Sequence, residues 1–352
     1  MKTITVNASK KYDVIIGAGL LESAAELIKK AVSGKTAFVI SDDNVFPLYG
    51  NRLILSLQKG GYKTYSYVFK SGESSKNLTT YSSILEKMCE SGITRSDFVI
   101  ALGGGVTGDL AGFTAATYQR GIDFIQLPTS LLAAVDSSVG GKTGVDLKSG
   151  KNQVGCFCQP SLVICDTELL STLNEAEYEN GCAEIIKYAV LGNKDLFDSI
   201  KALPVKEQYE EVIAECVNMK RHFVEADEFD GGLRMMLNLG HTIGHAVETL
   251  SKYKTAHGRA VAMGLCAIAR AALKKGYISK SDVEEIINLV LKYNLPAEIP
   301  YKAAELESIM MNDKKGKGDY ISLVVPEQIG KCSLIKTNKS DLLDWLKGGG
   351  IE

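Results

Sequence analysis

Residues 98–108 read FVIALGGGVTG, an apolar run that passes directly into a cluster of glycines. Shorter runs of the same kind end at glycine, aspartate or proline, and they lie at residues 14–16, 37–40 and 124–127. Between these runs, residues 21–30 and 79–91 repeat apolar positions at helical spacing. Strands that alternate with helices in this way predict βαβ units and a mostly parallel sheet, which binds ligands at the carboxyl ends of its strands.

The second half of the chain has a different pattern. After about Asp166, consecutive helices are predicted at residues 175–191, 207–226, 233–251 and 256–275, followed by a hairpin of residues 320–325 and 332–335. At roughly 150 residues per domain, the 352 residues suggest two domains. The predicted fold class is α/β plus α, with an N-terminal Rossmann-like parallel-sheet domain at residues 1–165 and a C-terminal mainly helical domain at residues 166–352.

The composition excludes several classes of protein. Lys and Arg number 40 against 42 Asp and Glu, so no excess of positive charge attracts nucleic acid or anionic lipid. The first residues, MKTITVNASKKYDV, lack the apolar core of a signal peptide, and no apolar run reaches the ~18 residues of a membrane helix. The 8 cysteines contain no CxxC pair and are expected to be reduced. A cytoplasmic protein without a nucleic-acid or membrane partner is predicted.

The glycine cluster at residues 103–108 fits the pattern GxGxxG, whose glycines let a backbone approach a pyrophosphate at a helix N-terminus. The Rossmann fingerprint belongs on the first strand, whereas this match follows a later one, so a tight strand-to-helix turn explains it equally well. Asp42 and Asn44, after an earlier strand, are candidate acceptors for ribose hydroxyls. Together these features favour a nucleotide, and NAD rather than NADP because no Arg neighbours Asp42.

Residues 137–143, SSVGGKT, imitate a phosphate-binding P-loop, but Asp136 stands where that loop requires glycine. An ATPase is therefore not expected. Lys142 in a glycine-rich turn still suits a phosphate, and Lys151 and Asn152 add polar groups nearby. The alternative for Lys142 is a solvated lysine on a loop.

Three of the 4 histidines lie close together in the chain: His241, His245 and His257. His241 and His245 are spaced i,i+4, which places both rings on one face of a helix and suits a zinc ion. A third, oxygen ligand would come from Glu184 or Glu248. A single histidine is more often a structural residue, but three in one short segment favour a metal or catalytic site.

Glu184 and Lys187 lie one helical turn apart. They form either an ordinary salt bridge on a solvated face or, because apolar residues flank them, a buried acid and base. Lys220 and Arg234 precede the histidines and, taken alone, are interpreted as surface charge.

Together, these segments resemble the 3-dehydroquinate synthase family of sugar phosphate cyclases, and the likeness runs through most of the chain. The motifs that carry it occur in this order: GGGVTGDLAGF, TYQRGIDFIQLPTSLLAAVDSSVGGKTGVD, GKNQVGCFCQP, GCAEIIKYAV, LNLGHTIGHAVE and HGRAVAMG. In the inosose-forming branch of the family, Asn is expected at this position, whereas this chain has Asp109. The motifs therefore resemble the dehydroquinate branch, which belongs to the shikimate pathway. The chain departs from the family pattern at Arg259, where glutamate is expected, and at Ser130, where threonine is expected.

The resemblance implies a dehydroquinate synthase-like fold with a metal-binding helical domain, and a phosphate-eliminating lyase that uses NAD and one divalent metal ion, Zn²⁺ or Co²⁺. The implied substrate is the sugar phosphate 3-deoxy-D-arabino-heptulosonate 7-phosphate. In the family, NAD oxidises the C5 hydroxyl, phosphate leaves, the ketone is reduced again, and the ring opens and recloses as 3-dehydroquinate. This is the second step of chorismate and aromatic amino acid biosynthesis, and the family precedent is a homodimer.

The resemblance also implies roles for individual residues. Glu184, His241 and His257 match the metal ligands, whereas spacing alone would pair His241 with His245; the family pattern keeps His245 for proton transfer near C5. The residues matched to the substrate phosphate are Lys142, Asn152, Asn238, one of Lys314 and Lys315, and Arg120 from this or a partner subunit. Those matched to the carboxylate are Lys220 and Arg234, and those matched to the ring hydroxyls are Asp136 and Lys187. The positions matched to cofactor binding are Asp42, Asn44, Glu73, Lys76, Gly104, Gly105, Asp109, Thr129, Ser130, Lys142, Lys151 and Thr172.

Two other enzymes and one non-enzyme remain as alternatives. Another sugar phosphate cyclase would share the scaffold. A metal-dependent NAD polyol dehydrogenase, such as glycerol dehydrogenase, has a related layout, but it would release NADH and would not need so many lysines around the metal. A regulatory nucleotide-binding module gives no reason for three clustered histidines. Phosphate release from the heptulosonate phosphate distinguishes these functions.

Overall fold

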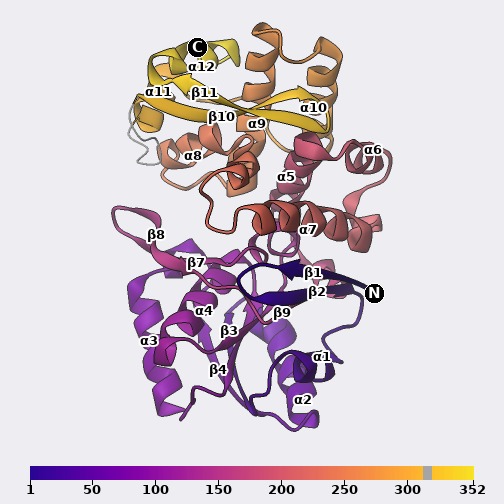
Figure 1. Ribbon diagram of the computed structural model, residues 1–352, viewed down its shortest axis with the longest axis vertical. Helices are drawn as coiled ribbons and strands as arrows, with labels where there is room; N and C mark the ends of the chain where they lie inside the picture. The colour runs from indigo at the N-terminus through magenta and orange to yellow at the C-terminus, as the bar shows by residue number, and fades with distance from the viewer. Residues whose placement is uncertain (312–318) are drawn as a thin grey trace. The chain divides into compact units, whose positions relative to one another are not determined.

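The computed structural model describes residues 1–311 and 319–352, which form two compact units (Figure 1). The first unit contains Met1–Leu173 and Tyr209–Phe229, and the second contains Asn174–Gln208 and Asp230–Glu352. Among the described residues, none of the helices combines the length and the apolar character that crossing a membrane requires.

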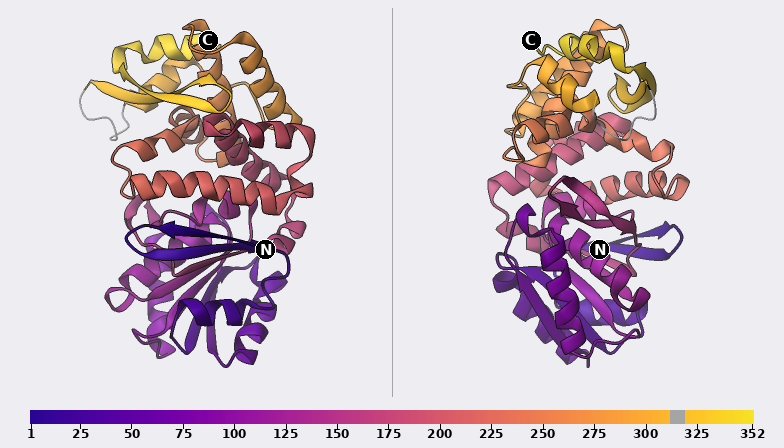
Figure 2. Two further views of the ribbon diagram at one scale, coloured as in Figure 1. Left: turned by 45° about the vertical axis from the view of Figure 1, so that its right-hand side comes forward. Right: turned by 90° about the vertical axis from the view of Figure 1, so that its left-hand side faces the viewer.

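The first unit is built on a seven-stranded sheet in the order β1-β2-β9-β6-β5-β3-β4. Its strands are β1 (Lys2–Asn7), β2 (Lys11–Gly17), β3 (Thr36–Asp42), β4 (Lys63–Phe69), β5 (Phe98–Gly103), β6 (Asp123–Pro128) and β9 (Leu162–Asp166). Neighbouring strands are parallel except β1 and β2, which form an antiparallel hairpin at one edge, drawn in indigo in Figure 2. The predicted, mostly parallel sheet is confirmed.

Helices cover both faces of this sheet. They are α1 (Ala24–Ala31), α2 (Asn51–Lys59), α3 (Leu78–Glu90), α4 (Gly105–Thr117) and α7 (Tyr209–Ala226), with short helical turns at Phe46–Gly50, Glu73–Ser75, Tyr118–Arg120, Ala133–Ser137 and Thr167–Thr172. Successive residues of β5 point to opposite faces, so Ile100 packs in one core with α1 and α2, while Val99 packs in another with α3 and α4. A separate hairpin of β7 (Lys142–Leu147) and β8 (Gly150–Phe157) packs on α4.

The glycine-rich turn after β5 is required by close packing. A Cβ placed on Gly103 would lie 2.4 Å from Oγ1 of Thr107, and one on Gly108 would lie 2.6 Å from Oε1 of Gln126. Larger residues at either position would push α4 away from the sheet. The tight strand-to-helix turn that the sequence offered as an alternative is therefore real, and it places the N-terminus of α4 at the carboxyl end of β5.

Helix α7 departs from the predicted division into residues 1–165 and 166–352, because it belongs to the first unit. It packs against β1, β2 and the turn Ala133–Ser137. Lys220 on α7 pairs with Asp136 in that turn, with 2.9 Å between Nζ and Oδ1. Helical periodicity indicates that these residues form a helix, but it does not indicate which apolar surface they cover.

The second unit is mainly helical. Its helices are α5 (Glu175–Gly192), α6 (Lys194–Ala202), α8 (His241–Leu250), α9 (His257–Lys274), α10 (Lys280–Lys292), α11 (Ala303–Met311) and α12 (Leu342–Gly348), with short helical turns at Val205–Glu207, Leu233–Asn238 and Lys339–Asp341. The predicted hairpin is present as β10 (Tyr320–Gln328) and β11 (Lys331–Asn338). Helix α9 is largely buried and packs against α5, α8, α10 and α12.

The predicted continuous helix at residues 233–251 is wrong. Leu233–Asn238 is a short 3-10 segment, and α8 begins only at His241. Gly240, between them, has a φ of 77°, a left-handed conformation that ends a helix and that glycine adopts most easily. A Cβ there would also lie 2.7 Å from the carbonyl oxygen of Val261. The break makes His241 the first residue of a helix.

Asp97 ties the start of β3 to the loop before β5, and its replacement should destabilise the protein. Its carboxylate accepts hydrogen bonds from the N–H of Thr36 and from the N–H and hydroxyl of Thr94. We expect Asp97→Asn to lower the free energy of unfolding by about 1–3 kcal/mol at neutral pH, because the new amide cannot accept all three bonds. Thermal or urea unfolding measures the change.

The same variant should show how stability depends on pH. Burial tends to raise the pKa of Asp97, but the hydrogen bonds from Thr94 and Thr36 outweigh it and lower the pKa below its usual value. The stabilisation is therefore present above the unfolded pKa of about 3.9 and is lost as the pH falls through the lower folded pKa. The difference between Asp97→Asn and the unmodified protein should shrink below about pH 4. A difference that stays constant in acid would contradict this explanation.

Candidate metal centre and neighbouring site residues

Three predicted site residues meet inside the second unit. Glu184 on α5, His241 at the start of α8 and His257 at the start of α9 offer ligand atoms that lie within 4.8 Å of one another. Oε1 of Glu184 is 3.3 Å from Nε2 of His241 and 3.2 Å from Nε2 of His257. Glu184 is fully buried, so its carboxylate requires compensating charge or hydrogen bonds.

The donor atoms and their spacing suit a divalent transition metal. Bonds of about 2.0–2.2 Å at tetrahedral angles place neighbouring zinc ligands about 3.3–3.6 Å apart. The separations of 3.3 and 3.2 Å from Glu184 lie near the lower end of that range. Three protein ligands of this kind leave a coordination position for a substrate oxygen, as catalytic rather than structural zinc sites do.

His245 and Glu248 lie beside this cluster, and with His257 they form a second group whose ligand atoms lie within 4.8 Å of one another. The ring centre of His245 is 5.4 Å from that of His241 and 6.1 Å from that of His257. Oε2 of Glu248 lies 3.2 Å from Nδ1 of His257, the ring nitrogen that does not face Glu184. Geometry therefore leaves both oxygen ligands of the sequence interpretation open: Glu184 with His241 and His257, or Glu248 with His245 and His257. If Glu184 is the ligand, Glu248 would be the partner of the other imidazole nitrogen of His257.

Charges around Glu184 keep its carboxylate ionised. Burial alone would raise the pKa of Glu184, but Lys187, His241 and His257 hold it well below its usual range. For His257, burial opposes protonation, yet hydrogen bonds to Glu184 and Glu248 raise its pKa to about 10. Because a metal binds neutral imidazole, a metal ion at this site would displace a proton from His257.

Three of the predicted cationic site residues are buried, which corrects part of the sequence interpretation. Nζ of Lys187 is 2.7 Å from Oε2 of Glu184, and the two side chains are 2% and 0% exposed, so the pair is not a solvated salt bridge. Arg234 is also buried, as is Lys220 in the first unit, so neither is surface charge. A buried charge in a small cluster is a candidate functional group, because burial without function is costly.

A second group of predicted residues meets in the first unit. Nζ of Lys76 is 2.5 Å from Oδ2 of Asp109 and 2.5 Å from Oδ1 of Asn152. Nζ of Lys151 is 3.4 Å from Oε1 of Glu73. Burial raises the pKa of Asp109, and the charge of Lys76 opposes that rise. Residues from the turn before α3, from α4 and from the hairpin β7–β8 thus form one polar cluster.

Further predicted cofactor residues lie where the strands of the first unit end. The N–H of Thr129, after β6, donates to the carbonyl of Gly103 at the end of β5. A Cβ on Gly104 would lie 3.3 Å from Oγ of Ser130, and one on Gly105 would lie 3.1 Å from a serine hydroxyl, so both glycines line a crowded turn.

Asp42 and Asn44 form a turn of their own at the end of β3. Oδ1 of Asp42 accepts from the N–H groups of Asn44 and Val45 at 2.9 Å each. The hydroxyl of Thr107 lies 3.4 Å from Oδ2 of Asp42. The carboxylate is thus oriented by the backbone. The hydroxyl of Thr172, another predicted cofactor residue, is hydrogen-bonded to that of Tyr49.

The remaining predicted substrate residues are placed as follows. Lys142 is exposed at the start of β7, and Arg120 is exposed in a turn where its φ is 71°. Asn238 ends the short segment before α8. Lys314 and Lys315 lie outside the described residues.

No motif indicates Asn180 or Glu179, which touch the start of α9. Oδ1 of Asn180 accepts from the N–H of Gly258 at 2.5 Å, and Oε2 of Glu179 is 3.1 Å from Nη1 of Arg259. The sequence signal that could have drawn attention to Asn180 is its residue type, because asparagine is a poor helix former and Asn180 lies inside α5.

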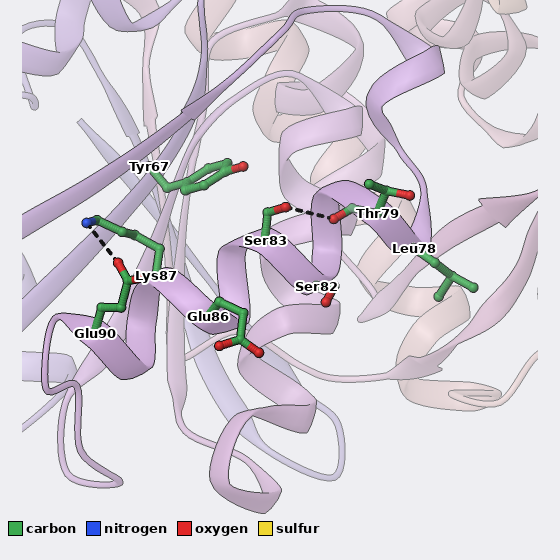
Figure 3. A pocket seen from close by; sticks show the side chains of 8 residues that line it. All are labelled: Tyr67, Leu78, Thr79, Ser82, Ser83, Glu86, Lys87 and Glu90. Carbon is green, nitrogen blue, oxygen red and sulfur yellow. Dashed lines mark hydrogen bonds and ion pairs between the residues drawn. The ribbon is translucent and has the colours of Figure 1, made fainter.

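A surface hollow of about 590 Å³ along α3 contains none of the predicted site residues (Figure 3). It is lined by Tyr67, Leu78, Thr79, Ser82, Ser83, Glu86, Lys87 and Glu90. Two pairs form within this lining: the hydroxyl of Ser83 donates to the carbonyl of Thr79, and Lys87 contacts Glu90. Nothing in this lining resembles a catalytic arrangement.

Comparisons of this sequence with known proteins point to one enzyme family. Residues 66–180 match the family model for the N-terminal part of 3-dehydroquinate synthase, and residues 181–316 match that for the C-terminal part. The 3-dehydroquinate synthase of Lactococcus lactis subsp. cremoris (strain MG1363) is 42% identical over 344 residues, which cover 96% of this chain and 97% of that protein. The chain belongs to the 3-dehydroquinate synthase family. A second member, from Clostridium botulinum (strain Alaska E43 / Type E3), is also 42% identical and is covered over 99% of its length.

Several solved structures of other enzymes have a similar fold. A 2-deoxy-scyllo-inosose synthase, complexed with carbaglucose-6-phosphate, NAD⁺ and Co²⁺, aligns with a TM-score of 0.86 at 25% identity, over 98% of this chain and 99% of that one. Glycerol dehydrogenase from Schizosaccharomyces pombe aligns with a TM-score of 0.69 at 17% identity, over 96% and 88% of the chains, and shows a shared fold only. The predicted dehydroquinate synthase-like fold is confirmed.

Proposed function

We propose that this chain is a 3-dehydroquinate synthase that converts 3-deoxy-D-arabino-heptulosonate 7-phosphate to 3-dehydroquinate and phosphate, with NAD and one divalent metal ion. The observation that carries the proposal is the cluster of buried Glu184 with the partly exposed His241 and His257, in which Lys187 pairs with the same carboxylate. A plain nucleotide-binding module has no use for such a cluster. Family membership supplies the substrate.

The residues of the second unit would bind and orient the reacting part of the substrate. Glu184, His241 and His257 would hold the metal ion, which polarises hydroxyl and ketone oxygens when bound. His245, which stays outside that set, would move the proton near C5, because a neutral imidazole accepts protons near pH 7. Lys187 would donate a hydrogen bond to a ring hydroxyl, and Arg234 would bind the carboxylate.

The family resemblance also assigns substrate roles to residues of the first unit. Lys220 would bind the carboxylate, and its partner Asp136 would accept a hydrogen bond from a ring hydroxyl. Lys142 and Asn152 would bind the phosphate, and the family resemblance assigns the same role to Asn238, Arg120 and one of Lys314 and Lys315. A dianionic phosphate requires several donors of this kind, because removing it from water is costly unless they replace its hydration.

NAD would lie along the strand ends of the first unit. Asp42 and Asn44 would accept hydrogen bonds from ribose hydroxyls, and the crowded turn at Gly104 and Gly105 would let the backbone approach the pyrophosphate. The other proposed contacts are Glu73, Lys76, Asp109, Thr129, Ser130, Lys142, Lys151 and Thr172. A cytoplasmic location, which the composition predicts, and a homodimer, which the family resemblance implies, stay predictions.

The proposed reaction is redox-neutral overall, so NAD should be regenerated in each turnover. With substoichiometric NAD added to the metal-loaded protein, we expect many equivalents of phosphate to be released from the heptulosonate phosphate while no NADH absorbance accumulates. Phosphate is measured colorimetrically, and NADH by its near-ultraviolet absorbance.

The alternatives give different results in the same assay. Stoichiometric NADH without phosphate release would contradict the proposal and indicate a polyol dehydrogenase, whose fold this chain shares. Phosphate release from glucose 6-phosphate, but not from the heptulosonate phosphate, would indicate another sugar phosphate cyclase. Either result would leave the metal centre in place and change the substrate.

A further inference from the structure

The first turn of α9, which carries His257, is held by α5 rather than by its own N-cap. Ala256, at the N-cap position, has no side chain that could accept a hydrogen bond from the helix. Asn180 of α5 supplies the acceptor instead, with 2.5 Å from its Oδ1 to the N–H of Gly258. Loss of a capping acceptor of this kind lowers the equilibrium constant for folding about 2- to 30-fold.

The backbones of the two helices meet at the same place. A Cβ on Gly258 would lie 2.3 Å from the carbonyl oxygen of Asn180 and 2.8 Å from its Oδ1. Only glycine therefore lets the first turn of α9 approach α5 this closely. The approach fixes the backbone of residue 258, next to His257, against one position of α5.

Asn180 and Glu184 lie on the same face of α5, because they are four residues apart. One helix face therefore holds the backbone beside His257 and also presents the carboxylate whose Oε1 is 3.2 Å from Nε2 of the same histidine. Glu248 contacts the other ring nitrogen, so it restrains the ring but not the helix that carries it.

Arg259, the residue that departs from the family pattern, adds to this contact. It lies 41% exposed and pairs with Glu179, the neighbour of Asn180, at 3.1 Å, and its guanidinium also donates to the carbonyl of Asn294. Its side chain therefore contacts α5 and the turn that follows α10 rather than the metal ligands. A partly exposed pair of this kind contributes little on its own, so the hydrogen bond from Gly258 is the stronger hold.

We propose that Asn180 is a positioning residue for the metal centre, because it caps the first turn of α9 and so holds His257 opposite Glu184. This inference rests on the proposed metal site. It assigns a role to a residue that would touch neither metal nor substrate. It also explains why a helix-disfavouring asparagine stands inside a largely buried helix.

The test compares three variants of the full-length protein. Asn180→Ala removes the acceptor, and Asn180→Asp keeps it. Asn174→Ala is the matched control, since Asn174 caps the start of the same helix by accepting from the N–H of Glu177 at 2.9 Å. The readouts are the Zn²⁺ dissociation constant by competition with a chromogenic chelator, the visible absorption of the Co²⁺ form, and the melting temperature of the metal-free protein.

We expect Asn180→Ala to weaken Zn²⁺ binding about tenfold, as loss of an outer-sphere partner does, and to alter the Co²⁺ spectrum. Asn180→Asp should bind Zn²⁺ within about threefold of the unmodified protein, because the acceptor remains. Asn174→Ala should lower the melting temperature of the metal-free protein but leave the Zn²⁺ affinity unchanged. Equal effects of Asn180→Ala and Asn174→Ala on affinity would overturn the inference, as would a lower melting temperature with unchanged affinity.

Glu184→Gln separates failure of this inference from failure of the proposed metal site. If Glu184→Gln binds Zn²⁺ as tightly as the unmodified protein, the ligand assignment is wrong and the inference fails with it. If Glu184→Gln loses Zn²⁺ while Asn180→Ala retains full affinity, the metal site stands and only the role of Asn180 is refuted.

Discussion

His257→Asn is expected to lose bound metal and enzymatic activity together, whereas His245→Gln should keep the metal and lose turnover. His257 presents Nε2 to Glu184 at 3.2 Å, and its removal opens one corner of the proposed ligand set. Loss of an outer-sphere partner alone costs about 10- to 100-fold, so loss of a ligand should lower activity by more than about a hundredfold. Loss of a general acid–base group should lower turnover about 100- to 10,000-fold without releasing the ion.

Metal content by atomic emission, measured on each purified variant together with kcat, decides between the two assignments. His222, the exposed histidine on α7, provides the control, and His222→Gln should retain both metal and activity. Should His245→Gln be purified without metal while His257→Asn stays loaded, the ligand pair suggested by i,i+4 spacing is the right one. The assignment of Glu184, His241 and His257 would then be wrong.

Local spacing could not have identified this ligand set. The ring centres of His241 and His257 are 5.1 Å apart, and those of His241 and His245 are 5.4 Å apart, so sequence proximity does not distinguish the two pairs. The proposed set depends on Glu184, whose Oε1 faces both Nε2 atoms and which lies on a helix far away in the chain. Only the resemblance of ordered motifs connected these three positions before the fold was known.

The parts of the fold that follow from local physics were predictable. The apolar run that ends in glycines at residues 98–108 forms β5 and begins α4, and the helical periodicity after residue 175 forms α5. Gly240 could also have been interpreted as a helix end, since glycine inside a periodic segment is a known stop signal.

The parts that depend on long-range packing were not predictable. Helix α7 has the periodicity of any amphipathic helix, and its place against β1 and β2 depends on an apolar surface about 200 residues earlier in the chain. The burial of Arg234 and Lys220 is of the same kind, because charged side chains are exposed unless the fold supplies partners. The sequence indicates that Arg234 and Lys220 have a role other than surface charge only once the family resemblance is taken into account.

Lys187→Met should destabilise the metal-free protein by about 3–5 kcal/mol, because it leaves the carboxylate of Glu184 without its buried cation. Nζ of Lys187 is 2.7 Å from Oε2 of Glu184, and Nζ also lies 4.0 Å from the centre of the Tyr188 ring. Methionine has a similar length and no charge, so the packing changes little. Urea unfolding with a chelator present measures the free energy of unfolding.

Two further variants test the reason for this loss. Lys201→Met breaks a pair of the same type on the surface, where Lys201 and Glu285 are 53% and 41% exposed at 2.8 Å, and it should cost at most about 1 kcal/mol. Glu184→Gln/Lys187→Met removes both charges and should be more stable than Lys187→Met alone. If the double variant is the less stable of the two, the loss comes from packing rather than from the unpaired charge.

Metal binding should reverse part of the loss, because a divalent cation at Glu184 supplies the charge that Lys187→Met removes. A ligand that binds only the folded state raises the free energy of unfolding. The increase grows with the logarithm of the ratio of ligand concentration to dissociation constant. Saturating Zn²⁺ should therefore raise the melting temperature of Lys187→Met more than that of the unmodified protein, in which Lys187 and the metal repel each other across one carboxylate. Equal shifts in the two proteins would show that the ion does not bind at Glu184.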